Sequence, residues 1–115
     1  MEKTKNYQKR ILNFMLAYGG TDDMLCAIEK INAKYAKGVK ITAEMLKENL
    51  MTANVPAVDY VIRTGGEPHN SAGFMMWDTA NSQLYFSEKF YPDFGVADLE
   101  VAIDDFVARG RRLGA

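Results

Sequence analysis

The stretch VIRTGGEPHNSAGFMMW, residues 61–77, decides the fold class of this sequence. A short apolar run ends in Arg63, two glycines follow, and a polar loop leads back to apolar residues. Such a run, bounded by glycines, predicts a short β-strand. An arginine is costly to desolvate unless an anionic group meets it. The sequence therefore predicts an anionic partner for Arg63.

Three apolar runs predict strands, at residues 10–20, 58–64 and 83–87. The first run is apolar on both faces, which suits a strand in a sheet that is covered on both sides. Residues 74–80 fit one or two helical turns. Strands that alternate with helices predict an α/β fold, a parallel β-sheet flanked by helices.

Helices are predicted from Thr21 to about Ala36, over residues 43–50, and from Val96 into the basic C-terminal tail. Thr21 is the predicted N-cap of the first helix, with two aspartates in the first turn as the helix dipole prefers. Thr42 is the predicted N-cap of the second helix.

The composition indicates one domain without a membrane anchor. Residues 1–9 are a polar lead-in that we expect to be mobile, and residues 10–115 form a single α/β domain. The net charge is −1, from 14 basic and 15 acidic residues, so no nucleic-acid partner is expected. The single cysteine, Cys26, excludes an internal disulfide and fits a reducing compartment. No apolar run is long enough for a transmembrane helix, and a cytoplasmic location is expected.

The glycines after Arg63 fall where parallel sheets bind ligands, at the carboxyl end of a strand. Gly65 and Gly66 allow positive φ and a close approach of the backbone to a ligand, and Ser71 can add a hydroxyl donor. A planar guanidinium favours bidentate binding of phosphate or carboxylate. The alternative is that Arg63 pairs with Glu67 and that the glycines serve only the turn. Spacing alone leaves both open.

Other catalytic patterns are missing from the sequence. His69 is the single histidine, so a site of several histidines is excluded, and no cysteine pair offers a zinc site. No P-loop, dinucleotide fingerprint or nucleophile elbow occurs. On composition, the arginines near the C-terminus indicate a solvated helix end.

Five segments, taken in order, resemble the C-terminal half of the cis-prenyltransferases, the undecaprenyl diphosphate synthase family. They run from about Tyr7 to Gly114 and are LNFMLAYGGTDD (12–23), KITAEML (40–46), VDYVIRTGGE (58–67), FMMW…QLYFS…FYPDF (74–94) and RRLG (111–114). The resemblance implies the fold of that half.

The resemblance implies a ligand for Arg63. In this family the arginine of the corresponding motif binds the diphosphate of isopentenyl diphosphate, together with a second arginine and a serine. Ser71 fits the serine role here. The second arginine is absent, and His69 or Asn70 lies in its neighbourhood.

Two further family positions are matched in part. Where the family has an acidic residue that helps to hold magnesium, this chain has Gln83, a neutral carbonyl ligand at best. The terminal Arg-x-Gly of the family, which reaches across the dimer interface to the partner's substrate, matches Arg112 and Gly114. Mg²⁺ is therefore expected mainly on the substrate diphosphate and a partner chain.

The Asp-Gly-Asn motif and the tunnel walls of the family's first half are not found in this sequence. We therefore predict a subunit of a split or heteromeric cis-prenyltransferase, which condenses isopentenyl diphosphate with an allylic prenyl diphosphate only with a second protein subunit that carries the Asp-Gly-Asn half. An incomplete apolar sheet also needs a covering partner. The alternatives are a non-catalytic scaffolding partner of a full-length or N-terminal-half synthase, and a truncated product. Proximity to a membrane surface stays open.

Overall fold

A pair of parallel strands lies at the centre of the computed structural model, which describes residues 2–7 and 9–110. Strand β1 (Tyr60–Arg63) pairs with β2 (Gln83–Phe86), with Tyr60 opposite Gln83 and Arg63 opposite Phe86. Both strands fall inside the predicted ranges, and the predicted α/β class with a parallel sheet is confirmed. The two strands therefore present their carboxyl ends at one edge.

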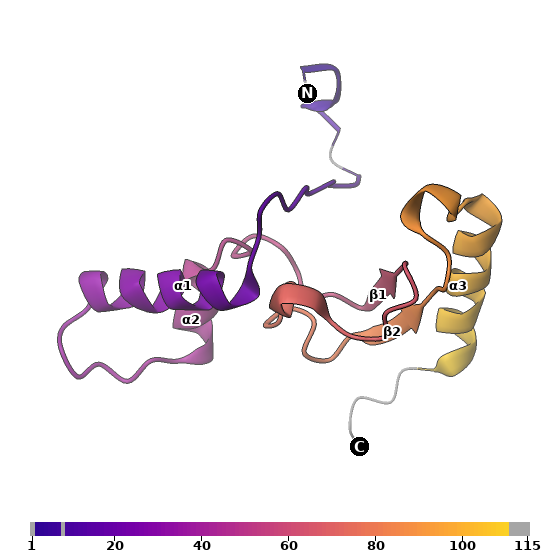
Figure 1. The fold of residues 1–115 in the computed structure, drawn as a ribbon. Coiled ribbons are helices and arrows are strands. Elements are labelled where there is room, and N and C mark those ends of the chain that lie inside the picture. Colours follow the sequence, from indigo (N-terminus) through magenta and orange to yellow (C-terminus); the bar gives the residue numbers. More distant parts are fainter. Residues whose placement is uncertain (1, 8, 111–115) are drawn as a thin grey trace.

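Helix α3 (Val96–Arg109) lies beside the strand pair, as the helical spacing predicts (Figure 1). The Tyr60 hydroxyl contacts this helix: it lies 2.8 Å from the carbonyl oxygen of Ala102 and 3.0 Å from Asp105 Oδ2. Burial, and next the hydrogen bond to Asp105, raise the pKa of Tyr60 to about 12. The phenol therefore stays protonated and a donor at neutral pH.

Helices α1 (Gly20–Lys34) and α2 (Ala43–Asn49) pack against each other around the main apolar core. The fully packed members of this core are Ala27, Ile31, Leu46 and Leu50. Thr42 caps α2 as predicted, since its Oγ1 accepts from the Met45 amide at 3.2 Å. The predicted Thr21 cap of α1 is wrong. Gly19 takes the N-cap position, and Thr21 lies inside the helix.

The predicted strand over residues 10–20 is wrong, because residues 10–19 form no regular element and α1 begins at Gly20. A strand forms only where a neighbour pairs with its backbone. This segment instead runs away from β1 and β2 (Figure 1). Its large apolar side chains are exposed, namely Ile11, Leu12, Phe14 and Leu16. The apolar pattern thus marks a surface that the described residues do not cover.

The loop between β1 and β2 forms turns over residues 74–80, where one or two helical turns were predicted, and no regular α-helix forms there. A short 3₁₀ helix, η2 (Ser71–Gly73), begins it, and two amide–carbonyl hydrogen bonds, at 2.9 and 2.8 Å, then fold residues 73–79 into turns. Two other 3₁₀ turns are η1 (Glu2–Thr4) and η3 (Tyr91–Asp93). Gly20 lies directly against this loop, since a Cβ built there would meet the Gly73 carbonyl oxygen at 1.9 Å.

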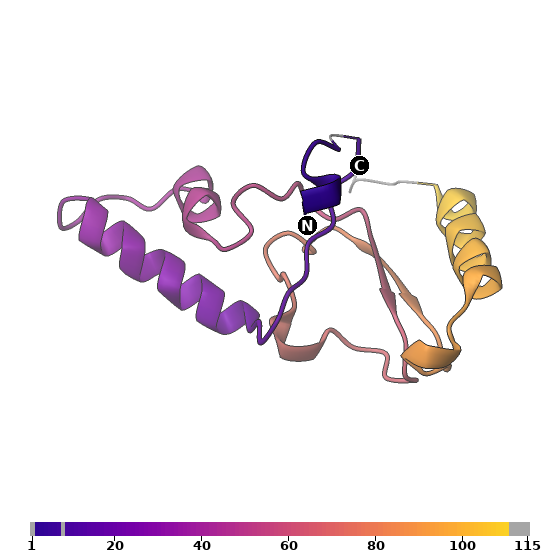
Figure 2. The same ribbon diagram turned by 90° about the horizontal axis from the view of Figure 1, so that it is seen from above.

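The described chain is open in shape (Figure 2). Its radius of gyration is 17.1 Å, with extents of 52 × 43 × 26 Å, against about 13 Å for a compact domain of this length. The α1–α2 pair lies on one side of the loop over residues 70–82, and the strand pair with α3 lies on the other (Figure 1). None of the helices in residues 2–7 and 9–110 is long and apolar enough to cross a bilayer.

We expect Gly20→Ala to destabilise the protein by about 1–3 kcal/mol, the usual cost of overpacking. The added methyl would collide with the Gly73 carbonyl, and this cost outweighs the gain in helix propensity. Thr21→Ala, on an exposed neighbouring position, is the control and should change stability little. Urea denaturation of both variants measures the difference. Equal midpoints would contradict the close contact.

Candidate diphosphate site at the carboxyl end of strand β1

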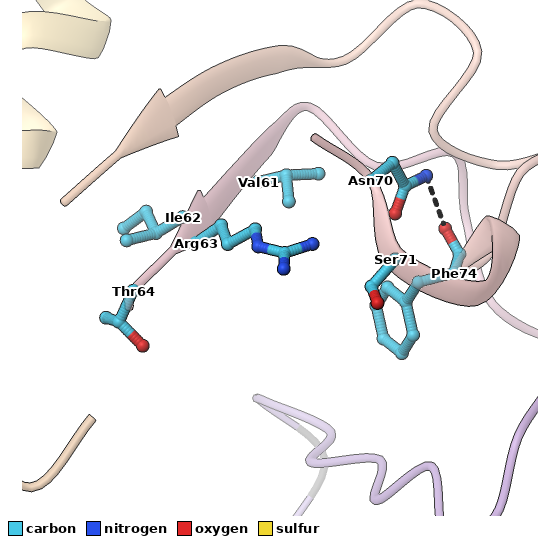
Figure 3. Close-up of a pocket in the computed structure, with 7 residues that line it drawn as sticks. All are labelled: Val61, Ile62, Arg63, Thr64, Asn70, Ser71 and Phe74. Carbon is cyan, nitrogen blue, oxygen red and sulfur yellow. Dashed lines mark hydrogen bonds between the residues drawn. The ribbon is translucent and has the colours of Figure 1, made fainter. Parts of the chain in front are cut away.

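A pocket of about 410 Å³ opens beside β1, where the strand ends in Arg63. One side is formed by β1 and the residue after it, and the other by the start of the loop (Figure 3). The lining residues are Val61, Ile62, Arg63, Thr64, Asn70, Ser71 and Phe74. Ligands of parallel sheets bind at this edge. The structure thus brings together two of the predicted site residues, Arg63 and Ser71.

The Arg63 guanidinium already has partners within its own loop. One terminal nitrogen lies 2.6 Å from Glu67 Oε2, and the other donates to the His69 carbonyl oxygen at 2.5 Å. The alternative raised by the sequence, a pair with Glu67, is therefore present. The Glu67 side chain is 65% exposed, however, and exposed ion pairs are weak. Arg63 still extends toward Asn70 and Ser71 across the pocket (Figure 3).

Gly65 and Gly66 adopt the predicted positive φ, at 97° and 72°. Their amide groups do not serve the pocket. Gly65 donates to the carbonyl of Lys89 at 2.8 Å and Gly66 to that of Ser87 at 3.0 Å. These bonds tie the turn to the chain after β2. The described contacts thus give the glycines a role in turn geometry, and ligand contact by their backbone stays a prediction.

The segment of residues 70–74, here called the far wall, faces Arg63 across the pocket (Figure 3). Asn70 Nδ2 donates to the Phe74 carbonyl at 3.2 Å, so its amide shapes the wall. The Phe74 ring meets Tyr18 edge to face, with centroids 5.8 Å apart. His69 precedes the wall, and its Nε2 lies 3.7 Å from Glu67 Oε2, so the ring sits near the counter-ion of Arg63.

Gln83 lies at the other end of the strand pair from Arg63. It begins β2 opposite Tyr60, and its Oε1 is buried and accepts no hydrogen bond from the described residues. Within residues 2–7 and 9–110, no group of three or more His, Cys, Asp or Glu side chains could hold a metal ion. One neutral oxygen does not fit a resident Mg²⁺ site. The predicted contributions of Arg112 and Gly114 lie outside the described residues.

Sequence reasoning missed Thr64 and Phe74 as pocket residues. Thr64 directly follows Arg63, just after β1 ends, and lines the same pocket. Phe74 was expected to begin one or two helical turns. Neither carried a distinctive sequence signal.

The whole described chain matches one protein family. A family model described as "Putative undecaprenyl diphosphate synthase" matches residues 1–114. The chain is 39% identical to the isoprenyl transferase of Bacillus thuringiensis subsp. konkukian, covering 99% of this chain and 45% of that protein. It is 38% identical to a tritrans,polycis-undecaprenyl-diphosphate synthase (geranylgeranyl-diphosphate specific) of Methanocaldococcus jannaschii, covering 98% of this chain and 42% of that protein. The chain thus spans less than half the length of these relatives.

A solved structure shows the same fold. The crystal structure of lavandulyl diphosphate synthase from Lavandula x intermedia, in complex with dimethylallyl diphosphate, matches with a TM-score of 0.76 and 34% identity. The match covers 87% of this chain and 44% of that one. Since a family model matches almost the entire sequence, this chain belongs to the undecaprenyl diphosphate synthase family of prenyltransferases.

Proposed function

We propose that this chain supplies the isopentenyl diphosphate-binding half of a cis-prenyltransferase site and works with a second polypeptide that supplies the other half. The observation that carries the proposal is the pocket at the carboxyl end of β1, where Arg63 and the Ser71 segment face each other. A guanidinium fork and a hydroxyl donor suit the oxygens of a diphosphate. The expected cytoplasmic location belongs to the same proposal.

In the proposed reaction a carbon–carbon bond forms between isopentenyl diphosphate and the allylic carbon of a prenyl diphosphate, whose own diphosphate leaves while a proton is lost. The diphosphate of isopentenyl diphosphate does not react. Arg63 therefore holds it equally in the ground state and the transition state, which is uniform binding. The role of Arg63 is to anchor and orient this substrate. Mg²⁺, when bound, would neutralise the departing diphosphate, and its ligands are expected on the substrate and the second chain.

The need for a second polypeptide rests on the exposed apolar surface of the chain. The exposed fractions are 77%, 78% and 87% for Leu12, Phe14 and Leu16. The relatives of this chain are more than twice as long as the chain itself. Large exposed apolar patches are typical of interaction surfaces. In the proposed complex, the partner's strands pair with this segment and cover it.

A second candidate function is that of a non-catalytic scaffold that stabilises a catalytic partner. The pairing of Arg63 with Glu67, and the neutral Gln83 where the family has an acid, favour it. In that case Arg63 is a structural residue and no substrate reaches it.

A reconstitution assay separates the two functions. The purified chain is mixed with the N-terminal half of the Bacillus isoprenyl transferase, radiolabelled isopentenyl diphosphate and an allylic primer. Elongation should require both proteins. Arg63→Ala should raise KM for isopentenyl diphosphate roughly 10- to 100-fold, the worth of a charged hydrogen bond, with a smaller change in kcat.

The control is Arg109→Ala, because Arg109 pairs with Asp105 and donates to the Leu84 carbonyl but does not line the pocket. It should leave both constants nearly unchanged. Elongation that is indifferent to Arg63→Ala would support the scaffold. Elongation by the chain alone would refute the need for a second polypeptide.

Glu67→Gln should increase the affinity for inorganic pyrophosphate by roughly 3- to 10-fold, since the ligand would no longer compete with a carboxylate for Arg63. Titration calorimetry at low salt measures the change. Glu88→Gln is the matched control, because that carboxylate lies beside Gly66 while Arg63 pairs with Glu67. A loss of affinity in Glu67→Gln alone would show instead that Glu67 orients the guanidinium.

A further inference from the structure

Two aspartates that the proposed chemistry does not use are almost fully buried near the far wall. Asp23 on α1 is 1% exposed, and Asp78 in the loop is 4% exposed. A buried carboxylate is costly unless its oxygens find partners. Asp23 accepts from the Tyr18 hydroxyl at 2.9 Å and from the Met51 amide at 2.8 Å. The Tyr18 ring also packs on Phe74 of the far wall. Asp23 therefore holds Tyr18, and Tyr18 in turn supports the far wall.

Asp78 connects the helical pair to the strand pair. Its Oδ1 accepts a short hydrogen bond from Lys47 Nζ on α2, and the same ammonium donates to the Thr52 carbonyl at 2.6 Å. The backbone carbonyl of Asp78 accepts from the Val58 amide at 2.8 Å, just before β1 begins. One residue therefore bonds to α2 through its side chain and to the entry of β1 through its backbone.

The turn that carries Asp78 is continuous with the far wall. The Thr79 hydroxyl donates to the Met75 carbonyl at 3.0 Å, and the Thr79 amide donates to the same oxygen at 2.8 Å. Within the wall itself, Gly73 lies against the first residue of α1, Gly20. A shift of the helical pair relative to β1 would therefore carry the far wall with it.

We propose that Lys47 and Asp78 are positioning residues, which set the distance between the far wall and Arg63. At this distance the Arg63 guanidinium and the Ser71 hydroxyl can both bind the same diphosphate. This inference rests on the proposed function of the pocket. Charge-assisted hydrogen bonds fix distance and direction better than apolar contacts do. A displacement of about 1 Å at a binding group can cost on the order of 100-fold in activity.

The pair must be removed as a unit. Asp78 Oδ2 is buried without a hydrogen-bond partner among the described residues, so Lys47 is the side-chain partner of this carboxylate there. Changing Lys47 alone would leave a buried charge, which is strongly destabilising, whereas replacing both members of such a pair by apolar residues is often neutral. The double variant Lys47→Met/Asp78→Leu therefore tests the position of the far wall without the loss of folding stability that an unpaired buried charge causes.

The experiment titrates the full chain with inorganic pyrophosphate by calorimetry and records thermal melting of each protein. Lys47→Met/Asp78→Leu should melt near the wild type but bind pyrophosphate about tenfold more weakly. Asp78→Asn keeps the shape of the side chain and an acceptor for Lys47, and its affinity for pyrophosphate should fall about threefold. This variant provides the test if the double variant fails to fold.

The control is Asp105→Leu/Arg109→Met. It removes an ion pair with the same change in net charge, together with the side-chain bonds of α3 to the Tyr60 hydroxyl and the Leu84 carbonyl, at residues that do not line the pocket. It should bind pyrophosphate as the wild type does even if its melting temperature falls. If Lys47→Met/Asp78→Leu and Asp78→Asn both bind pyrophosphate with wild-type affinity, while Arg63→Ala does not bind it, the positioning role is wrong but the proposed function of the pocket stands. Pyrophosphate binding that is insensitive to Arg63→Ala would instead overturn the proposed function of the pocket.

Discussion

The Arg63 guanidinium at the end of β1 is the group on which the site depends. A cation in this place must be compensated, and the loop that follows does so with the Glu67 carboxylate and the His69 carbonyl. Both partners come from the loop itself, so the site is stable without a ligand. Because Glu67 is mostly exposed, it can return to water when a stronger anion arrives. In the proposed function, the pairing of Arg63 with Glu67 and the binding of the diphosphate are therefore successive states of one site.

The rest of the fold positions this cation against the far wall. The helical pair has its own small core around Ile31, and the strand pair is covered by α3. The pair of half-buried Lys47 and buried Asp78 connects these two parts. The apolar segment before α1 contributes little to either, and its exposure matches a chain that spans less than half of its relatives.

The sequence predicted well those elements whose cause is local. The Thr42 cap and the positive φ of Gly65 each follow from neighbouring residues, and both are present. The two short strands formed as predicted because each pairs with the other. The strand over residues 10–20 failed because a strand depends on a partner, which the described residues do not provide. The contact of Lys47 with Asp78 could not be foreseen, since nothing in the spacing of two distant polar residues indicates that they form an ion pair.

The most direct test of the central claim is a crystal structure of the chain, with its partner, bound to isopentenyl diphosphate. We expect diphosphate oxygens within hydrogen-bond distance of the Arg63 guanidinium and the Ser71 hydroxyl, with Glu67 turned out to solvent. A diphosphate bound elsewhere, while Glu67 still pairs with Arg63, would contradict it.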